Sequence, residues 1–279
     1  MRNYAKLSTS VEDFHLRRDL ASCSLVCRAW KTRAQKHLFA FLTIKGKRLS
    51  RYESLVLKSP ILRRFAKELF FYNEYIDESE STTTHRTVET ASHAVRIVQK
   101  LPQVRRLLLD TINLASEHPN FPRYMSSLTH ITQLDFVSPV PTKLFHLARM
   151  LVGLRGLSTL YLEVPIVISP NPTPLHASCY NTKSCLTSLD LPIHSGGQLL
   201  LDWLVQAGSF TKSLQRLQVS LEDHVPPSEV PSIVESVQSL LDNCSNHLKE
   251  WFFGAKVEIK DFSNIPDGNI ISAETLNTI

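Results

Sequence analysis

One apolar pattern recurs along most of the chain. An apolar residue is followed by two free positions, a second apolar residue, one free position and a third apolar residue. Six copies occur, and their first residues lie 27, 26, 29, 28 and 34 positions apart. The copies are Val104/Leu107/Leu109, Ile131/Leu134/Phe136, Leu157/Leu160/Leu162, Leu186/Leu189/Leu191, Leu214/Leu217/Val219 and Leu248/Trp251/Phe253. A fixed period of this length is typical of stacked repeat units, each of which buries its apolar face against a neighbour.

The apolar residues of each copy fit a short strand, and the segments between the copies carry helical signals. Apolar residues share one helical face over 88–101, and Thr142 is placed to cap the helix that follows it. Strands and helices that alternate with this period predict an α/β fold, namely an irregular leucine-rich-repeat solenoid of about six or seven strand–helix units. Ala66, Leu69 and Phe71 fit a degenerate first copy.

Two details refine this prediction. Leucine-rich repeats usually carry Asn three residues after the last leucine of the motif. The residues at those positions here are Ile112, Pro139, Pro165, His194, Glu222 and Lys256. Without an asparagine ladder we expect a loosely curved solenoid. Pro139, Pro165 and Pro192 are expected just after strands, where proline ends strand pairing. An ordinary α/β domain with leucine-rich strands is the alternative interpretation.

The N-terminal part of the chain has a different pattern. From Asp19 to about residue 42, apolar residues recur every three or four positions, which predicts an amphipathic helix that is either continuous or split. Its apolar stripe consists of Leu20, Cys23, Cys27, Trp30, Ala34 and Leu38. The apolar run at 42–44 then predicts a short strand. We expect two domains, a helical segment at 1–58 and the solenoid at 59–279.

Charge is also unevenly distributed. Residues 1–67 contain 16 Lys and Arg against 4 Asp and Glu and carry +12, whereas the remainder has 15 basic and 22 acidic residues and carries −7. A basic N-terminal part could bind nucleic acid or an acidic membrane surface. We favour a solvated helix surface, because the charges are interleaved with core-type apolar residues. Nucleic acid is therefore not an expected partner.

Composition and motifs exclude further classes. No apolar run approaches the roughly 20 residues that span a bilayer, and the first ten residues lack the apolar stretch of a secretory signal. The 5 cysteines have no framework spacing, which fits a reducing compartment. We therefore expect a cytoplasmic or nuclear protein without membrane contact. No phosphate-binding loop or nucleophile elbow occurs, so we expect no enzymatic activity, no cofactor and no metal.

Residues 16–44 carry a recognisable sequence. Its marks are Asp19-Leu20, the run Leu25-Val26-Cys27-Arg28 with Trp30, and Leu38-Phe39 before the short strand. The segment resembles the second half of an F-box, as found in fungal F-box proteins with leucine-rich-like repeats. A complete F-box opens with a Leu-Pro segment and an apolar first helix, which are missing here. We therefore expect an F-box that is truncated at its N-terminus.

The resemblance implies a function in protein recognition. In that family the F-box docks on the Skp-type adaptor of a cullin ubiquitin ligase, and the repeats recruit a substrate protein. The residues expected to contact the adaptor are Leu16, Leu20, Leu25, Val26 and Trp30. For Leu25 and Trp30, packing against the first repeat is the alternative. For the whole chain, the alternative is a non-catalytic repeat scaffold for protein–protein interaction without ligase association.

The target is expected to bind the free positions between the motif leucines. Side chains alternate between the two faces of a strand, so these positions point away from the core and onto the concave face. The residues expected to contact the target are Arg105, Arg106, Asp135, Tyr161, Glu163, Asp190, Gln218 and Phe252. Tyr161 and Phe252 stand out because aromatic side chains dominate the energetics of interfaces.

Overall fold

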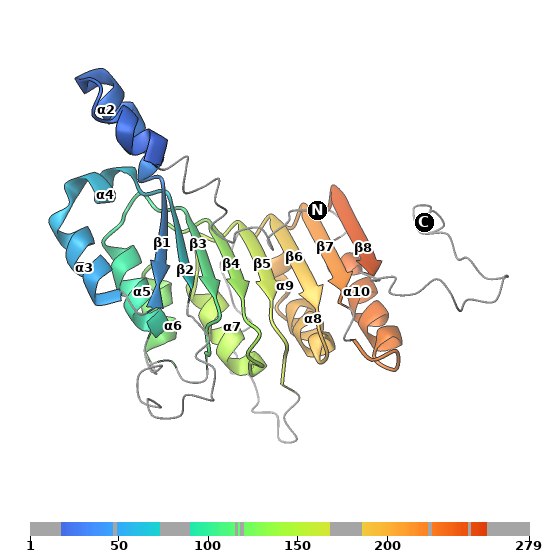
Figure 1. The fold of residues 1–279 in the computed structure, drawn as a ribbon. Coiled ribbons are helices and arrows are strands. Elements are labelled where there is room, and N and C mark those ends of the chain that lie inside the picture. Colours follow the sequence, from blue (N-terminus) through green and yellow to red (C-terminus); the bar gives the residue numbers. More distant parts are fainter. Residues whose placement is uncertain are drawn as a thin grey trace, which may run out of the picture.

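The fold is built on one parallel sheet. The structure is a computed structural model, and it describes residues 18–46, 49–72, 90–114, 117, 120–167, 186–222, 225–244 and 247–255. Eight strands pair in the order in which they occur along the chain (Figure 1). They are β1 (Phe41–Lys45), β2 (Glu68–Tyr72), β3 (Arg106–Asp110), β4 (Gln133–Val137), β5 (Thr159–Glu163), β6 (Ser188–Ile193), β7 (Arg216–Leu221) and β8 (Glu250–Ala255).

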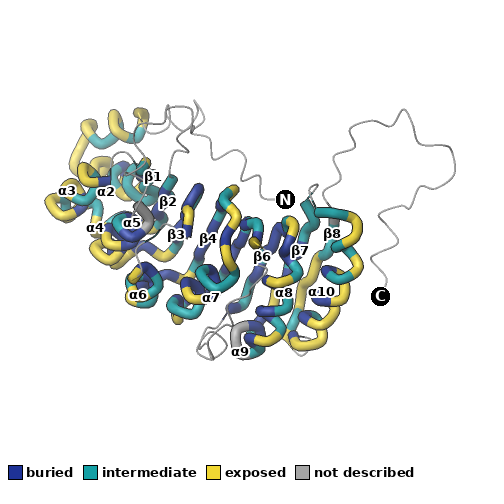
Figure 2. The backbone as a smooth tube through the Cα atoms, turned by 90° about the horizontal axis from the view of Figure 1, so that it is seen from below, coloured by how far each residue is buried: buried dark blue, intermediate teal, exposed yellow. Residues whose placement is uncertain are grey.

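The helices that connect these strands lie on one side of the sheet, as Figure 2 shows for α6, α7, α8 and α10. The described helices are α2 (Arg28–Leu38), α3 (Leu49–Lys58), α4 (Pro60–Phe65), α5 (Thr90–Gln99), α6 (Phe121–Ser126), α7 (Leu144–Gly153), α8 (Gly197–Gln206), α9 (Gly208–Thr211) and α10 (Val230–Cys244). Sequential parallel strands with helices on one side make a solenoid-like α/β arrangement.

The motif residues form the core between the sheet and the helices. Equivalent leucines stand side by side in register on neighbouring strands, as Leu107, Leu134 and Leu160 do. These side chains are fully buried, and they share one cluster with helix residues such as Val98 and Leu151. The six predicted strands are therefore confirmed. The degenerate copy at Ala66/Leu69/Phe71 and the run at 42–44 are confirmed as strands β2 and β1.

The sheet is larger than expected because β1 joins it. Phe41–Lys45 pairs with Glu68–Tyr72 over five residues. In the described residues the sheet thus has eight strands, one more than the largest number of units expected, and it extends across the expected domain boundary between residues 58 and 59.

Neighbouring units are joined at the point where each strand begins. One backbone carbonyl of the preceding unit accepts two N–H groups of the next, and the pattern repeats along the sheet. The accepting carbonyls belong to Ala40, Lys67, Arg105, Thr132, Ser158, Thr187 and Gln215. Side-chain hydroxyls reinforce three consecutive steps: Thr132 donates to Arg105 (3.4 Å), Ser158 to Thr132 (3.0 Å) and Thr187 to Ser158 (3.0 Å). Hydroxyls thus link the units of a chain that lacks the asparagine ladder.

Two helices are capped by carboxylates from the following unit. Glu117 accepts hydrogen bonds from the backbone N–H and the hydroxyl of Ser92 in the first turn of α5. Glu229 likewise accepts from the hydroxyl of Ser195 and the N–H of Gly196, which precedes α8. A carboxylate at a helix N-terminus satisfies free N–H groups and complements the helix dipole. Gly196 has φ 76°, a conformation that favours glycine.

Three sequence predictions need refinement or correction. The first helix is split, because residues 18–23 are helical and a turn separates them from α2. Thr142 does not cap α7: Lys143 occupies the cap position, while the Thr142 hydroxyl donates to the Val140 carbonyl and its N–H to that of Pro165. Pro192 lies within β6 instead of after it. Its missing N–H is tolerated because pairing of β6 with β5 ends at Asp190.

Candidate protein-interaction surfaces

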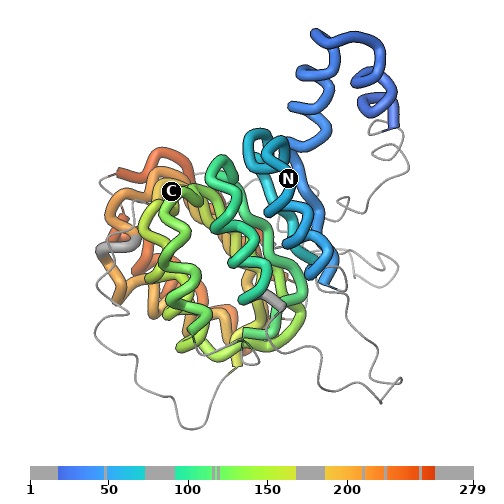
Figure 3. The backbone as a smooth tube through the Cα atoms, turned by 90° about the vertical axis from the view of Figure 1, so that its left-hand side faces the viewer, coloured from blue at the N-terminus to red at the C-terminus, as the bar shows by residue number. Residues whose placement is uncertain are grey.

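The first candidate surface lies at residues 18–38, which we call the head. Figure 3 shows that its helices project away from the sheet, and α2 leads directly into β1. Among the described head residues only Ala34 is buried. The amphipathic stripe predicted from the sequence therefore exists on α2, but the rest of the described chain covers little of it.

Three large apolar side chains of the head lie in solvent. Leu25 is 86% exposed, Val26 is 72% exposed and Trp30 is 57% exposed. Leu25 and Val26 occupy the turn between the two helical segments, where their N–H groups bond to the carbonyls of Ser22 and Cys23. We call Leu25, Val26 and Trp30 the head patch. Closely spaced exposed apolar residues of this size are typical of binding surfaces.

The five predicted adaptor residues thus have different environments. Leu25, Val26 and Trp30 are exposed, and Leu20 is half-buried. Leu16 lies outside the described residues. Neither Leu25 nor Trp30 is buried against the rest of the described chain, so the exposures favour adaptor contact over packing against the first repeat.

The second candidate surface is the face of the sheet opposite the helices, which we call the open face. Alternate strand residues place three rows of side chains on it. The first row is Phe41, Glu68, Arg106, Gln133, Thr159, Ser188, Arg216 and Glu250. The second row is Thr43, Phe70, Leu108, Asp135, Tyr161, Asp190, Gln218 and Phe252. The third row is Lys45, Tyr72, Asp110, Val137 and Glu163, with Pro192, Ser220 and Gly254 farther along.

Asp135 is the centre of a charged network on the open face. Arg106 donates to its Oδ2 from Nε (2.9 Å) and Nη2 (2.5 Å), and Gln133 donates to its Oδ1 (3.2 Å). Arg106 also lies 3.3 Å from Glu68 Oε2. Asp135 is fully buried in spite of its position on the open face. A buried carboxylate with these partners fixes the side chains of three neighbouring strands.

A pair of carboxylates occupies the third row on either side of Val137. Asp110 accepts a hydrogen bond from the hydroxyl of Thr111 (2.9 Å), and Glu163 accepts one from the phenol of Tyr161. Burial raises the pKa of Asp110, and the charge of Glu163 raises it further, while the hydrogen bonds from Thr111 oppose the rise. Burial and the nearby carboxylate of Glu163 thus destabilise the ionised form of Asp110.

Thr111 reaches this position in a left-handed conformation. Its φ is 59°, which is uncommon for a β-branched residue. In this conformation its hydroxyl meets Asp110 and its N–H donates to the carbonyl of Val137 (2.9 Å). The next strand therefore holds the backbone that orients Asp110.

Seven of the eight predicted target residues lie on the open face, and Arg105 does not. Arg105 precedes β3, and its guanidinium donates to the carbonyl of His130 at the edge where the strands begin. Phe252 is 56% exposed, whereas Tyr161 is buried among its neighbours. Sequence reasoning missed Glu68, Phe70 and Tyr72. The same alternation would have found them if β2 had been assigned as a full copy.

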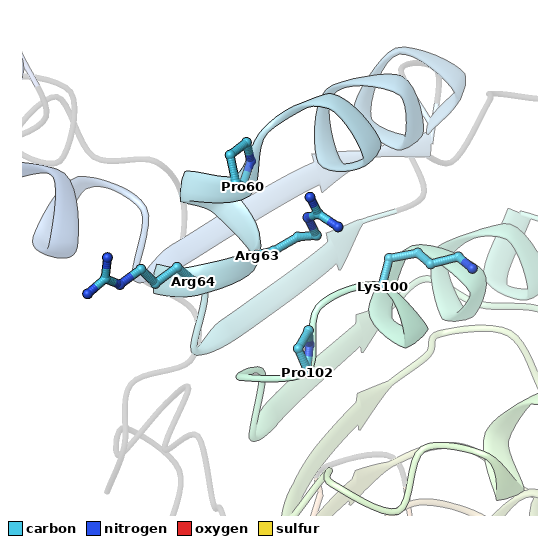
Figure 4. Close-up of a pocket in the computed structure, with 5 residues that line it drawn as sticks. All are labelled: Pro60, Arg63, Arg64, Lys100 and Pro102. Carbon is cyan, nitrogen blue, oxygen red and sulfur yellow. The ribbon is translucent and has the colours of Figure 1, made fainter.

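Basic residues line a shallow depression near the N-terminal end of the sheet. It has a volume of about 420 Å³, and its lining consists of Pro60, Arg63, Arg64, Lys100 and Pro102. Figure 4 shows that Arg63 points towards the side of Lys100, whereas Arg64 points away from it. The Arg64 guanidinium lies 5.4 Å from the ring centre of Phe65. The three cations therefore do not converge on one point.

No group of three or more His, Cys, Asp or Glu among the described residues could hold a metal ion. No helix in the described ranges combines the length and the apolar character needed to cross a membrane.

No model of a known protein family matches this chain, and no curated protein is significantly similar to it in sequence.

Proposed function

We propose that this protein is a substrate-recognition subunit of a Skp–cullin–F-box ubiquitin ligase. The head is a partial F-box that binds the Skp-type adaptor, and the parallel sheet belongs to an irregular leucine-rich-repeat solenoid whose open face binds a target protein. The observation that carries the proposal is the exposure of the head patch, Leu25, Val26 and Trp30.

Exposure of these apolar side chains to water is energetically unfavourable. Burying a side chain such as Leu or Val contributes about 1.5–3 kcal/mol relative to leaving it in water. The motif leucines at β3 to β7 are at most 1% exposed, whereas the side chains of the head patch, on a projecting element, stay mostly in solvent. A partner that covers the head patch would recover this energy, and Trp is a frequent anchor of such interfaces.

The proposed mechanism is positional and involves no chemistry by this chain. A subunit that holds a target at one surface and an adaptor at another raises the effective concentration of the reacting groups. The sheet is well suited to the task because eight strands in register form a continuous framework between the head and β8.

The test is binding of the full chain to a purified Skp-type adaptor, measured by calorimetry. We expect Leu25→Asp combined with Val26→Asp to weaken binding by at least about 100-fold, since two buried apolar contacts are replaced by charges. Val234→Asp is the matched control, because Val234 is an exposed apolar residue on α10, far along the chain from the head. This variant should bind as the wild type does.

Two outcomes would overturn the proposal. One is no adaptor binding by the wild-type chain. The other is equal binding by the Leu25→Asp/Val26→Asp variant. If the chain binds a target protein but no adaptor, it is a repeat scaffold without ligase association.

A further inference from the structure

Charge on the open face is strongly biased. The face carries three basic side chains, Lys45, Arg106 and Arg216, and six acidic ones, Glu68, Asp110, Asp135, Glu163, Asp190 and Glu250, a balance of −3. The helical N-terminal part of the chain has the opposite sign. A face of one sign attracts partners of the other sign and repels partners of its own.

Two of the three basic residues of the open face, Arg106 and Arg216, are paired with acidic residues of the same face. Arg106 bonds to Asp135 and Glu68, and Arg216 lies 3.7 Å from Glu250. Asp110 and Glu163 differ from the acidic residues in these salt bridges. Their carboxylates accept hydrogen bonds from the hydroxyls of Thr111 and Tyr161, but neither forms a salt bridge with a basic residue in the described part of the chain.

The positions of these two carboxylates suit a long basic side chain. Asp110, Val137 and Glu163 stand side by side on β3, β4 and β5. Since neighbouring strands lie about 4.8 Å apart, the two acids are separated by roughly 10 Å across Val137. All three residues are partly exposed. A cation above Val137 would reach both carboxylates, and the aliphatic stem of Lys or Arg would cover the apolar side chain.

We propose that the open face binds a basic segment of the target protein and holds a lysine or arginine side chain of that segment between Asp110 and Glu163. Phe252, at the other end of the face, is the apolar contact of the same surface. This inference rests on the part of the proposed function that assigns target binding to the open face. It is independent of adaptor binding by the head.

A randomised peptide library selected on the immobilised full chain tests the proposal. Every chain used in the selection carries Leu25→Asp and Val26→Asp, so that the head patch does not select peptides. We expect the enriched peptides to be rich in Lys and Arg. Acetylating their lysines should abolish binding by peptides whose only basic residues are lysines.

Amide substitutions then locate the binding site. Asp110→Asn with Glu163→Gln removes two charges but keeps the acceptor oxygens for Thr111 and Tyr161, so we expect the fold to be retained and peptide affinity to fall by about tenfold. The control, Glu235→Gln with Asp242→Asn, removes two charges from α10 and should leave affinity within about twofold.

The following results would overturn the proposal: no enriched peptides, neutral or acidic enriched peptides, or equal binding of basic peptides to the Asp110→Asn/Glu163→Gln variant. Adaptor binding by the wild-type chain is measured separately. Failure of the open-face inference is therefore distinguishable from failure of the ligase assignment.

Discussion

The head and the sheet use similar apolar side chains in opposite ways. Trp203 on α8 is 1% exposed and lies in the core, whereas Trp30 on α2 is 57% exposed. Both residues lie on amphipathic helices. The difference arises because α8 packs against α10 and shares the core cluster with the strand leucines, while α2 contacts little beyond α4. An apolar stripe therefore identifies a face to be covered, and only the fold determines whether the chain or a partner covers it.

The end of the sheet is intermediate between these extremes. Trp251 of β8 occupies a motif position in register with the buried Leu217, yet it is 49% exposed. Every other motif strand is followed by another strand, whereas β8 is the last one described. Stacked repeats bury their apolar faces only against neighbours, so a terminal unit is less buried than a central one.

The largest expected effect compares the core of the sheet with the head patch. Phe136 is fully buried, so Phe136→Ala should lower the free energy of unfolding by about 3–5 kcal/mol. Trp30→Ala should change it by less than about 0.5 kcal/mol, because an exposed side chain loses little on truncation. Chemical denaturation of the two variants measures both values. Equal destabilisation by the two substitutions would show that the head is part of the core.

The next effect concerns close backbone packing between the turns that precede β4 and β5. A Cβ atom at Gly156 would lie 2.3 Å from the Thr129 carbonyl oxygen, whereas one at Gly208 would have no neighbour within 4 Å. Gly156→Ala should therefore cost about 1–3 kcal/mol, and Gly208→Ala should be neutral or stabilise by up to about 1 kcal/mol. Thermal unfolding of the pair provides the measurement. A stable Gly156→Ala variant would mean that units β4 and β5 are packed less closely than described.

The hydrogen bonds that side-chain hydroxyls form between neighbouring units are expected to have a smaller effect on stability. Thr187→Val removes the hydrogen bond to the Ser158 carbonyl and should cost about 0.5–1.5 kcal/mol. Thr159→Val, a similar change on the open face of β5, should be close to neutral. If both variants have the same free energy of unfolding, the hydroxyls do not contribute to the joining of units.

The smallest expected effect is a pH dependence at Asp110. Burial raises the pKa of its carboxyl in the folded state, so the folded state binds a proton more tightly than the unfolded state does. The free energy of unfolding therefore falls as the pH rises from about 4, the pKa of Asp in the unfolded chain, to the higher pKa of Asp110 in the folded state. Asp110→Asn should gain stability relative to wild type as pH increases from about 4 to 7. If the difference in free energy of unfolding between the variant and the wild type stays constant across this range, the pKa of Asp110 is not raised by folding.

Periodicity was sufficient to predict the strands but insufficient to predict their surroundings. The spacing of Leu134 and Phe136 identified β4 because strand side chains alternate and the buried ones must be apolar. The same alternation placed Asp135 on the open face, but its complete burial depends on Arg106 and Gln133, whose side chains converge on it. Contacts between units are not encoded in the period of one unit.

Local capping and backbone conformation were predicted less well. Thr142 has a residue type typical of helix caps, but the pairing of its backbone with Pro165 and Val167 places it one residue too early. No sequence signal identified the left-handed backbone at Thr111, which is held by its N–H bond to Val137. In both cases a neighbouring unit determined the local structure.

Hydrogen–deuterium exchange of the full chain with and without a Skp-type adaptor tests whether the head is the adaptor-binding surface. We expect the adaptor to slow exchange in residues 18–38 and to leave strands β3 to β7 unchanged. Protection confined to the open face, or no protection in the head, would contradict this expectation.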